Sequence, residues 1–453
     1  MLDPAAMMFA SPELSRLFSP PQAIQRMLDV EAALARAEAA AGIIPPEAAR
    51  AIGAQCQAVF YDADTLYRDA IGAASPAVPL VRMLTARVGG GAARFVHWGA
   101  TSQDIIDTAM VLQIRDALGL LGARLREIGG TCAGLAERYR RTPMAGRTLL
   151  QQAVPITFGL KAARWLGLVT RSAERLTAVR PSLLVVQFGG AAGTLASLGP
   201  EGLRVMELLA AELRLGVPAL PWHAERDRIA ALGAALGIVS GAMGKIATDL
   251  ALLSQTEVGE VVPAPGRGGR SSAMPHKRNP VDATAALAAC RLALAAVPVV
   301  FYGMLQEHER AAGGWQAEWR AVPDLFRFAG GSADAVARAL GGLAADERRM
   351  AANLALGGGQ IMAEALTVAL ADRVGRDAAY RLVEAACERA AGAGAELRDA
   401  AEADEQIRAA LPDDAIARAL DPTRYVGSAG AFIDRALAEF HATQAAEAGG
   451  REP

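Results

Sequence analysis

The 453-residue sequence is poor in aromatic residues, cysteine and histidine. Aromatic residues make up only 5% of the chain, which has 4 cysteines and 5 histidines. The cysteines (Cys56, Cys132, Cys290 and Cys387) are far apart, and no two histidines have the spacing of metal ligands on one helix face. These absences argue against disulfide bonds and a structural metal site. We expect the cysteines to be small core residues in a reducing compartment.

The sequence also lacks an excess of charge of one sign and a long apolar run. Its net charge of −2 provides no basic surface for nucleic acid or an anionic membrane. The amino-terminal MLDPAAMMFA has neither the basic stretch nor the apolar run of a signal peptide. The apolar segment 229–244 has 16 residues, fewer than the ~20 that span a bilayer. We therefore expect a cytoplasmic protein with no nucleic-acid or membrane partner, and a buried helix at 229–244.

Helix-forming residues dominate what is present. Hydrophobic residues make up 52% of the chain, and alanine and leucine recur while β-branched and aromatic residues are comparatively scarce. This composition favours an all-α protein. One heptad seam, with apolar residues alternately three and four apart, consists of Ile229, Leu232, Leu236, Val239, Met243, Ile246, Leu250 and Leu253. It predicts a helical bundle that we expect to be shared between subunits, the alternative being a seam buried within one chain.

Glycine-rich stretches and changes of composition suggest how the chain is divided. Breaks near residues 100 and 355 predict three domains, at 1–100, 101–355 and 356–453. A helix is expected over 22–41, ending at Gly42. Thr101 followed by Asp104 has the form of a capping box, in which the threonine hydroxyl accepts a free amide of the helix that begins there.

The segment 263–280, PAPGRGGRSSAMPHKRNP, contains the most informative pattern. It is rich in glycine and bounded by proline, so we expect a loop between two helices. A serine hydroxyl becomes a useful base only where amides and a fixed positive charge stabilise its alkoxide. Ser271 or Ser272 with Lys277 could supply that arrangement. A solvated basic linker is the alternative, because short motifs often occur by chance.

Residues 271–280 resemble the signature of the aspartase/fumarase superfamily, although Arg270 stands where that family has glycine. The resemblance implies that Ser271 is the proton-abstracting base. Residues 97–104 (HWGATSQD) resemble the first conserved block of the superfamily, whose hydroxyls bind a carboxylate at a helix amino terminus. That end of a helix presents free amides and a positive dipole, but a plain helix cap is the alternative. Residues 146–153 (GRTLLQQA) resemble the second block, which by itself indicates only a helix start.

The resemblance implies a site without metal or cofactor, in which Ser271 and Lys277 are catalytic. Substrate-binding residues would be His97, Thr101, Ser102, Thr148, Gln151, Ser272, Met274, His276, Asn279 and Arg310. A lone histidine such as His223 or His276 is more often a hydrogen-bonded structural residue. Arg310 and Trp315 could line the pocket or form a surface helix corner. Arg147, Arg278 and Arg310 are the candidates for a further carboxylate contact.

Differences within these blocks separate the subfamilies. Fumarate-releasing lyases commonly have a histidine directly after the threonine of the second block, where this chain has Leu149, which cannot exchange a proton. Segments 97–107, 151–158, 188–198, 245–260 and 306–319 resemble the carboxymuconate cycloisomerases. That resemblance implies a three-domain all-α fold, a homotetramer with shared active sites, and lactonisation of 3-carboxy-cis,cis-muconate, a small polycarboxylate. The alternatives are a fumarate-releasing lyase of the adenylosuccinate or argininosuccinate type, and a non-catalytic structural relative.

Overall fold

A computed structural model describes residues 4–262, 269, 271 and 273–449. Helices contain 71% of the residues and strands 5%, which confirms the predicted all-α class. The chain divides into two compact units, one of residues 1–125, 172–244 and 285–335, the other of residues 126–171, 245–284 and 336–453. Their boundary falls within five long helices, α7 (Ser102–Arg138), α8 (Phe158–Ala178), α11 (Asp227–Leu253), α12 (Val281–Tyr302) and α13 (Gly314–Leu340). This division does not test the three predicted domains, which stay a prediction.

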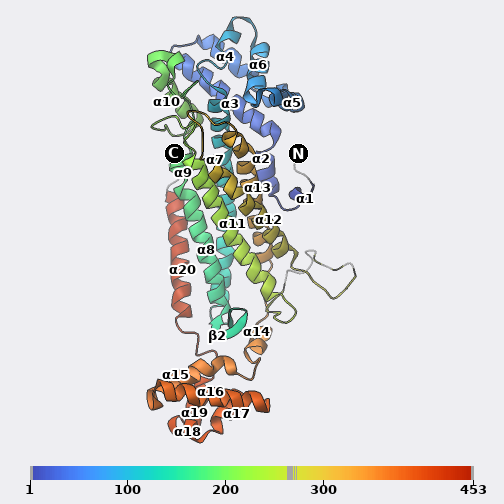
Figure 1. Ribbon diagram of the computed structural model, residues 1–453, viewed down its shortest axis with the longest axis vertical. Coiled ribbons are helices and arrows are strands. Elements are labelled where there is room, and N and C mark those ends of the chain that lie inside the picture. The colour runs from blue at the N-terminus through green and yellow to red at the C-terminus, as the bar shows by residue number, and fades with distance from the viewer. Residues whose placement is uncertain (1–3, 263–268, 270, 272, 450–453) are drawn as a thin grey trace. The chain divides into compact units, whose positions relative to one another are not determined.

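The first unit has its main hydrophobic core among α3, α4, α6, α10 and the start of α7 (Figure 1). Its shorter elements are α1 (Pro4–Met7), α2 (Pro12–Leu17), α3 (Pro20–Ala40), α4 (Pro46–Gln55), η1 (Ala58–Phe60), α5 (Ala63–Ala73), α6 (Ala77–Val88), η2 (Gly90–Phe95), α9 (Arg180–Leu183), η3 (Ala196–Glu201) and α10 (Gly202–Leu213). The helix expected over 22–41 is α3. It begins at two prolines, whose missing amide donors cost nothing in a first turn, and ends before Gly42 at φ +77°.

Two carboxyl groups lie on the buried face of α3. Glu31 and Glu38 are each 1% exposed. Neither oxygen of Glu38 has a hydrogen-bond partner in the part of the chain that the structure describes. Burial, and to a smaller extent the charge of Glu31, raise the pKa of Glu38 to about 9. Glu38 is therefore protonated in the folded protein at neutral pH.

The raised pKa of Glu38 predicts a specific loss of stability with pH. The folded protein holds this proton more tightly than the unfolded chain, so stability is highest below the ordinary pKa of glutamate and falls as pH rises towards 9. We expect Glu38→Gln to abolish this loss. The unfolding free energy of the variant relative to the wild type should rise by about 1.4 kcal/mol per pH unit above about pH 5. Denaturant titrations at several pH values measure it, and parallel curves for the two proteins would contradict it.

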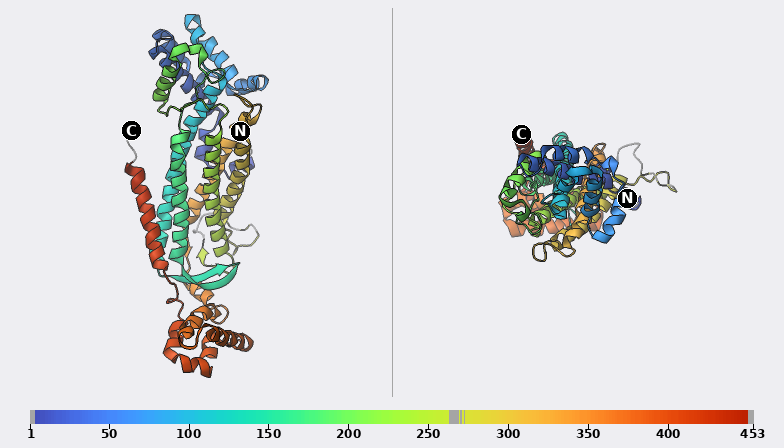
Figure 2. Two further views of the ribbon diagram at one scale, coloured as in Figure 1. Left: turned by 60° about the vertical axis from the view of Figure 1, so that its left-hand side comes forward. Right: turned by 90° about the horizontal axis from the view of Figure 1, so that it is seen from above.

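The heptad seam of α11 is buried within the single chain. All eight of its apolar residues are at most 4% exposed. In the first unit, glycines of α11 face α12 closely: a Cβ added at Gly233 would lie 2.3 Å from Val300 Cγ2, and one at Gly244 would lie 2.7 Å from Cys290 Sγ. Figures 1 and 2 show α11 and α12 side by side. The alternative, a seam buried within one chain, is therefore confirmed, because neighbouring helices of the same chain already cover it. That the bundle as a whole is shared between subunits stays a prediction.

Two helices, α11 and α12, are long and apolar enough by length and composition to cross a membrane. In α11, 72% of the most apolar window is buried inside the protein, as expected of a core helix. This confirms the prediction of a buried helix at 229–244. In α12 only 28% of the corresponding window is buried. Exposed apolar side chains of α12 include Leu292, Leu294, Phe301 and Tyr302.

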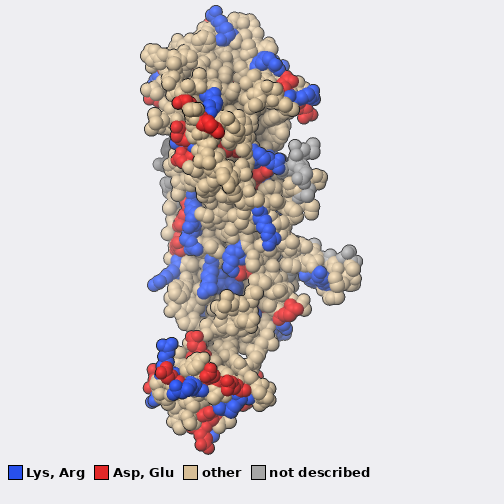
Figure 3. Space-filling view, viewed as in Figure 1, with Lys and Arg blue, Asp and Glu red and all other residues tan. Residues whose placement is uncertain are grey.

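The second unit contains two short antiparallel sheets and a separate helical cluster. Its elements are β1 (Pro143–Thr148), β2 (Gln151–Thr157), β3 (Val261–Val262), β4 (Ala344–Ala345), α14 (Glu347–Leu354), η4 (Gln360–Met362), α15 (Ala363–Val374), α16 (Arg376–Ala393), α17 (Leu397–Glu402), α18 (Glu405–Ala410), α19 (Asp413–Ala419) and α20 (Ala429–Gly449). Helices α15 to α19 pack around their own core, which includes Leu366, Val383 and Ile407. Acidic and basic side chains are interspersed on the surface of this cluster (Figure 3).

The cysteines are free thiols in the structure. Cys56, Cys132 and Cys290 are buried, which confirms their prediction as small core residues, whereas Cys387 is half-buried. Burial raises the pKa of the Cys132 thiol to about 12, so this side chain is an uncharged core residue at neutral pH.

Candidate active site

The amino terminus of α7 carries the first candidate block. The carboxylate of Asp104 accepts a hydrogen bond from the amide of Thr101 at 3.0 Å, which confirms the acidic half of the predicted capping box. The hydroxyl of Thr101 makes a contact that the sequence did not predict, because it accepts a hydrogen bond from Arg310 Nη1 at 2.7 Å. Ser102 is the first residue of the helix. A cation therefore lies beside the helix end that we expect to bind a carboxylate.

Asp104 anchors this helix end to a glycine-rich segment of the same unit. Its carboxylate accepts hydrogen bonds from the amides of Gly189 at 3.0 Å and Gly190 at 2.9 Å, and lies 2.8 Å from His223 Nε2. A Cβ at Gly189 would lie 2.8 Å from His223 Cε1, so only glycine fits there. His223 is buried and hydrogen-bonded in this network, as a structural histidine would be.

A buried ionic network lies one turn further along α7. The Arg226 guanidinium donates to Asp107 at 2.7 and 3.1 Å and to Glu318 at 2.5 and 3.2 Å, and each of the three side chains is at most 1% exposed. Burial raises the pKa of Glu318 to about 7 although Arg226 opposes the shift. Trp315 donates its indole N–H to Asp107 at 2.9 Å. Trp315 is buried, so its interpretation as a surface corner is wrong, and its interpretation as a pocket wall stays a prediction.

Arg310 is held by main-chain and side-chain acceptors of the first unit. Besides its bond to Thr101, its Nη2 donates to the carbonyl oxygens of Gly190 at 3.4 Å and Ala191 at 2.9 Å. All three of these acceptors are neutral, so the charge of Arg310 is not cancelled by a carboxylate among its recorded contacts. The structure thus brings together two predicted site residues that are more than 200 positions apart in the sequence.

His97 has a partner that the sequence analysis missed. Its Nδ1 lies 2.7 Å from Glu31 Oε1, and its backbone has φ +59°. A signal was available, because Glu31 and Glu38 occupy positions of the apolar stripe of α3 that continues from Ile24 and Leu28. A charged residue on a buried helix stripe needs a partner or a shifted pKa.

The second candidate block is a β-hairpin of the second unit, so the helix start indicated by residues 146–153 is wrong (Figure 2). Thr148 pairs with Gln151 across a two-residue turn, in which Leu149 and Leu150 have φ of +50° and +65°. Positive φ at both central residues matches the twist of paired strands and outweighs helix propensity here. Both leucines are exposed, Leu149 at 96% and Leu150 at 79%, and such backbone strain often marks a functional site.

A buried carboxylate holds the hairpin close to its turn, at the pair Arg147 and Gln152. Glu260 is fully buried and accepts two hydrogen bonds from Arg147, each at 2.8 Å. Asn353 donates to Glu260 Oε1 at 2.8 Å, and Gln152 donates to the Asn353 carbonyl at 2.8 Å. Arg147 is therefore committed to Glu260 and is a poor candidate for a substrate carboxylate.

The third candidate block, the signature loop, closes on itself. The amide of Asn279 donates to the Gly269 carbonyl at 2.8 Å, and the amide of Ser271 donates to the Lys277 carbonyl at 3.3 Å. Within this turn, Ser271 Oγ accepts the amides of Met274 at 3.0 Å and Ala273 at 3.3 Å. Two donors aimed at one hydroxyl oxygen stabilise negative charge on it. Ser272 and Arg270 lie outside the described residues.

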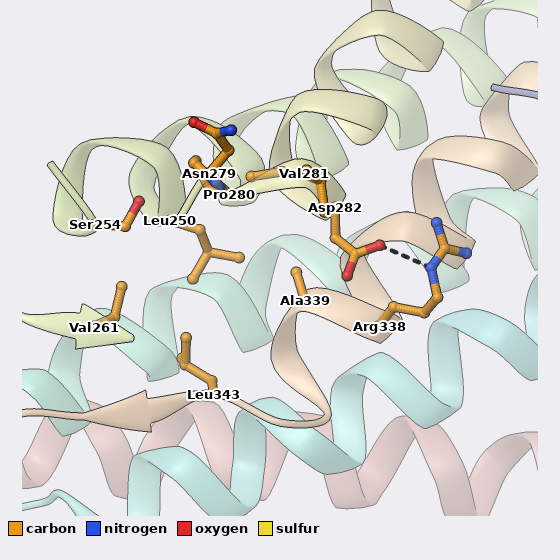
Figure 4. Close-up of a pocket in the computed structure, with 11 residues that line it drawn as sticks. Leu250, Ser254, Val261, Asn279, Pro280, Val281, Asp282, Arg338, Ala339 and Leu343 are labelled. Atoms are coloured by element: carbon orange, nitrogen blue, oxygen red, sulfur yellow. Dashed lines mark hydrogen bonds and ion pairs between the residues drawn. The ribbon is translucent and has the colours of Figure 1, made fainter. Parts of the chain in front are cut away.

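The other predicted loop residues face solvent. Lys277, His276, Arg278 and Met274 are exposed, and Lys277 forms no recorded ion pair with a described residue. Asn279 is half-buried at the edge of a cavity lined by Leu250, Val261, Leu343 and others (Figure 4). Its amide points away from Leu250 and Leu343, and the ion pair of Asp282 and Arg338 also lines the cavity. Because Arg338 is already paired with a carboxylate, this cavity fits the expected carboxylate site poorly.

The predicted site residues are distributed over both units. His97, Thr101, Ser102 and Arg310 belong to the first unit. Thr148, Gln151, Ser271, Met274, His276, Lys277 and Asn279 belong to the second. Within each unit the structure gathers residues that are far apart in sequence, as the contact of Thr101 with Arg310 illustrates.

Comparison with known protein families identifies the superfamily to which the three blocks belong. A family described as lyase matches residues 7–294, more than half of the chain. This chain belongs to the aspartase/fumarase superfamily of lyases. A second family, described as adenylosuccinate lyase C-terminus, matches residues 359–436, a range that contains α15 to α19. The family resemblance inferred from the three blocks is thereby confirmed.

Relatives within the superfamily differ in reaction. The 3-carboxy-cis,cis-muconate cycloisomerase of Pseudomonas aeruginosa is 46% identical over 438 residues, which cover 96% of this chain and 95% of that protein. The crystal structure of the 3-carboxy-cis,cis-muconate lactonizing enzyme from Pseudomonas putida matches with a TM-score of 0.93 and 42% identity, covering 98% of this chain and all of that one. A nitrosuccinate lyase of Streptomyces davaonensis is 43% identical and covers 91% of this chain. Similarity in this range therefore fixes the superfamily more firmly than the substrate.

Proposed function

We propose that this enzyme catalyses the reversible lactonisation of 3-carboxy-cis,cis-muconate without a cofactor. The observation that carries the proposal is the Ser271 hydroxyl, whose oxygen receives two main-chain amides in a loop that also contains Lys277 and Asn279. A hydroxyl in that setting can release and recover a proton, because its alkoxide is stabilised. Relatives over 40% identical that are named for this reaction support the choice of substrate.

The proposed chemistry needs only groups of the substrate and the chain. A carboxylate oxygen of the substrate forms a C–O bond to one carbon of the conjugated double bond. The displaced electron pair moves onto the adjacent carboxylate, and Ser271 then delivers a proton to the neighbouring carbon. In the reverse direction the Ser271 alkoxide removes that proton and the C–O bond breaks. Ring closure within one molecule gains from a high effective concentration.

Several cationic and amide groups fit the three carboxylates of this substrate. The amino terminus of α7 offers amides and the hydroxyls of Thr101 and Ser102, with Arg310 beside them. Lys277 and Asn279 would hold the carboxylate on which charge accumulates, a role in which preorganised donors are most effective. Arg147 is not assigned to a substrate carboxylate, because its guanidinium already donates to Glu260.

The hairpin tip weighs against a fumarate-releasing reaction. Elimination of an amine or a nucleotide base needs a proton donor for the leaving group. Leu149 and Leu150 provide none, and both side chains project from the turn into solvent. In the lactonisation, the group that attacks and leaves is a carboxylate of the substrate itself. Such a leaving group needs no proton donor, so an apolar tip is compatible with this reaction.

The direct test is turnover of the proposed substrate. Purified protein mixed with 3-carboxy-cis,cis-muconate, with a chelator and without nucleotide, should remove the diene absorbance and form a lactone. Parallel incubations with adenylosuccinate, argininosuccinate and nitrosuccinate would detect fumarate release. Fumarate from any of these, with an unchanged diene, would replace the proposal by the corresponding lyase activity.

We also propose a soluble cytoplasmic homotetramer whose active sites are completed by more than one subunit. The exposed apolar side chains Leu294 and Phe301, seven residues apart on α12, share a helix face that another copy of the chain would cover. The hairpin residues Thr148 and Gln151 are exposed around a strained tip, an arrangement suited to insertion into a neighbouring subunit.

Shared active sites predict that two inactive variants can rescue each other. We expect Ser271→Ala and Arg310→Ala to be nearly inactive alone, because each lacks one essential block. Mixed tetramers, reassembled after mild dissociation, should recover a measurable part of wild-type activity in sites that receive both intact blocks. Light scattering should give a native mass four times the 47.0 kDa of one chain. A monomeric mass, or no recovery in verified mixed tetramers, would contradict shared sites.

A further inference from the structure

The contact between His97 and Glu31 has the geometry of a histidine held by a carboxylate. Their side chains are 2.7 Å apart, with Glu31 1% and His97 17% exposed. The other oxygen of Glu31 has no recorded partner among the described residues, so His97 is the recorded ligand of a buried carboxylate. Hydrogen bonds to a buried charge are the strong ones, since the partner replaces lost water.

The backbone of His97 supports the same conclusion. Its φ of +59° lies in the left-handed region, which costs a residue with a side chain about 1 kcal/mol or more. Surrounding contacts must compensate for such strain, and the recorded side-chain contact of His97 is the one to Glu31. The turn therefore serves to place this imidazole, because a relaxed backbone would direct the ring elsewhere.

The contact also restricts which ring nitrogen carries a proton. Glu31 accepts the Nδ1 proton, so Nε2 is the nitrogen left for a ligand, and no described residue bonds to it in the recorded contacts. In the neutral ring Nε2 would be a bare lone pair that repels a carboxylate, whereas in the imidazolium it donates a proton. Burial lowers the pKa of His97, but the charges of Glu31 and Asp104 and the Glu31 hydrogen bond outweigh it and leave that pKa raised.

Neighbouring groups indicate which ligand this nitrogen would meet. His97 precedes the amino terminus of α7 by a few residues, in the same segment as Thr101, which contacts the Arg310 guanidinium. Free helix amides, a guanidinium and an imidazolium all favour a negatively charged group. The carboxylate of Asp104 is already bound by main-chain amides and lies against His223, so it competes little with such an anion for the Nε2–H of His97.

We propose that Glu31 is a positioning residue, which holds His97 by Nδ1 so that Nε2–H binds a carboxylate of the substrate at the amino terminus of α7. This assignment rests on the proposed function, since it takes a polycarboxylate as the ligand. Glu31 itself does not touch the substrate. It acts through the orientation, tautomer and charge of the imidazole, as carboxylates do behind other functional histidines.

The test compares two isosteric substitutions on one helix. Glu31→Gln removes the charge behind His97, whereas Glu38→Gln changes an equally buried carboxyl two turns away that has no recorded partner. We expect Glu31→Gln to raise KM for 3-carboxy-cis,cis-muconate about 10- to 100-fold, the effect of one charge-assisted hydrogen bond, with kcat changed far less. In its pH profile, the loss of kcat/KM with rising pH should begin at lower pH. Glu38→Gln should leave KM and this profile unchanged.

A double variant shows whether Glu31 acts through the imidazole. His97→Asn should raise KM, and adding Glu31→Gln to it should raise KM no further, because the group that Glu31 positions is gone. Independent effects of the two substitutions, an unchanged KM in Glu31→Gln, or an equal effect of Glu38→Gln would overturn the proposal. Circular dichroism and the melting temperature confirm that each variant is folded.

A binding measurement separates this proposal from the proposed function. Calorimetric titration with propane-1,2,3-tricarboxylate needs no turnover, and its Kd should rise about 10-fold or more in Glu31→Gln. If the wild type does not lactonise the muconate but this binding still depends on Glu31 and His97, the proposed function fails and the positioning role stands. If lactonisation occurs but neither KM nor Kd responds to Glu31→Gln, the positioning role fails alone.

Discussion

Ser271→Ala is expected to lower kcat for lactonisation by about 10²- to 10⁴-fold, the usual contribution of a positioned proton-transfer group. The substitution removes the one oxygen that receives the amides of Ala273 and Met274. Without it no group at that point can exchange the proton with the substrate carbon. Because the loop is also closed by main-chain hydrogen bonds, such as that between Asn279 and Gly269, we expect helicity and native mass to be unchanged.

A matched control is available directly after α11, at Ser254. Ser254→Ala removes a hydroxyl that donates to the carbonyl of Ala251, in the last turn of that helix. Steady-state kinetics with the muconate should show near-normal kcat in that variant and little change of KM in either. Substantial turnover by folded Ser271→Ala would remove this serine from the mechanism and point to another loop residue.

Removing Arg226 should have the largest effect on stability. Arg226→Leu leaves the carboxylates of Asp107 and Glu318 buried without their shared cation. Such a loss typically lowers the free energy of unfolding by about 3–5 kcal/mol. Because the pKa of Glu318 is already about 7 beside Arg226 and should be higher without that cation, the deficit relative to the wild type should grow as pH rises from about 7 to 9. Denaturant titration at both pH values measures the effect.

A half-exposed ion pair provides the contrast. Arg338 pairs with Asp282 at 2.9 Å, but its side chain is 48% exposed. Arg338→Leu should therefore cost no more than about 1 kcal/mol. Equal destabilisation by the two arginine substitutions would contradict the prediction that the buried network contributes more stability than an exposed ion pair. Loss of the network should also weaken substrate binding, since Asp107 lies one turn beyond the α7 residues that the resemblance places at the substrate.

Helices and their buried faces were predictable because they depend on local sequence. The apolar period of α11, the prolines and Gly42 around α3, and the capping pair Thr101 and Asp104 all act over one or two turns. The hairpin turn at Leu149 and Leu150 was not predictable from local sequence, because leucine favours helices. Its positive φ angles are imposed by strand pairing and by the contact of Arg147 with Glu260, which is more than 100 positions away. The seam of α11 shows a related limit, since a periodic stripe indicates that a helix face is buried but not which helix buries it.

For this protein the sequence by itself determined the helical class, the superfamily and the residue types at the three blocks, since short-range propensities and motif spacing are written into adjacent positions. Only the tertiary structure decided which charges are free and which are taken. It assigned Arg147 to Glu260, Arg226 to Asp107 and Glu318, and His97 to Glu31, because electrostatic partners depend on distances in space and chain order does not encode them.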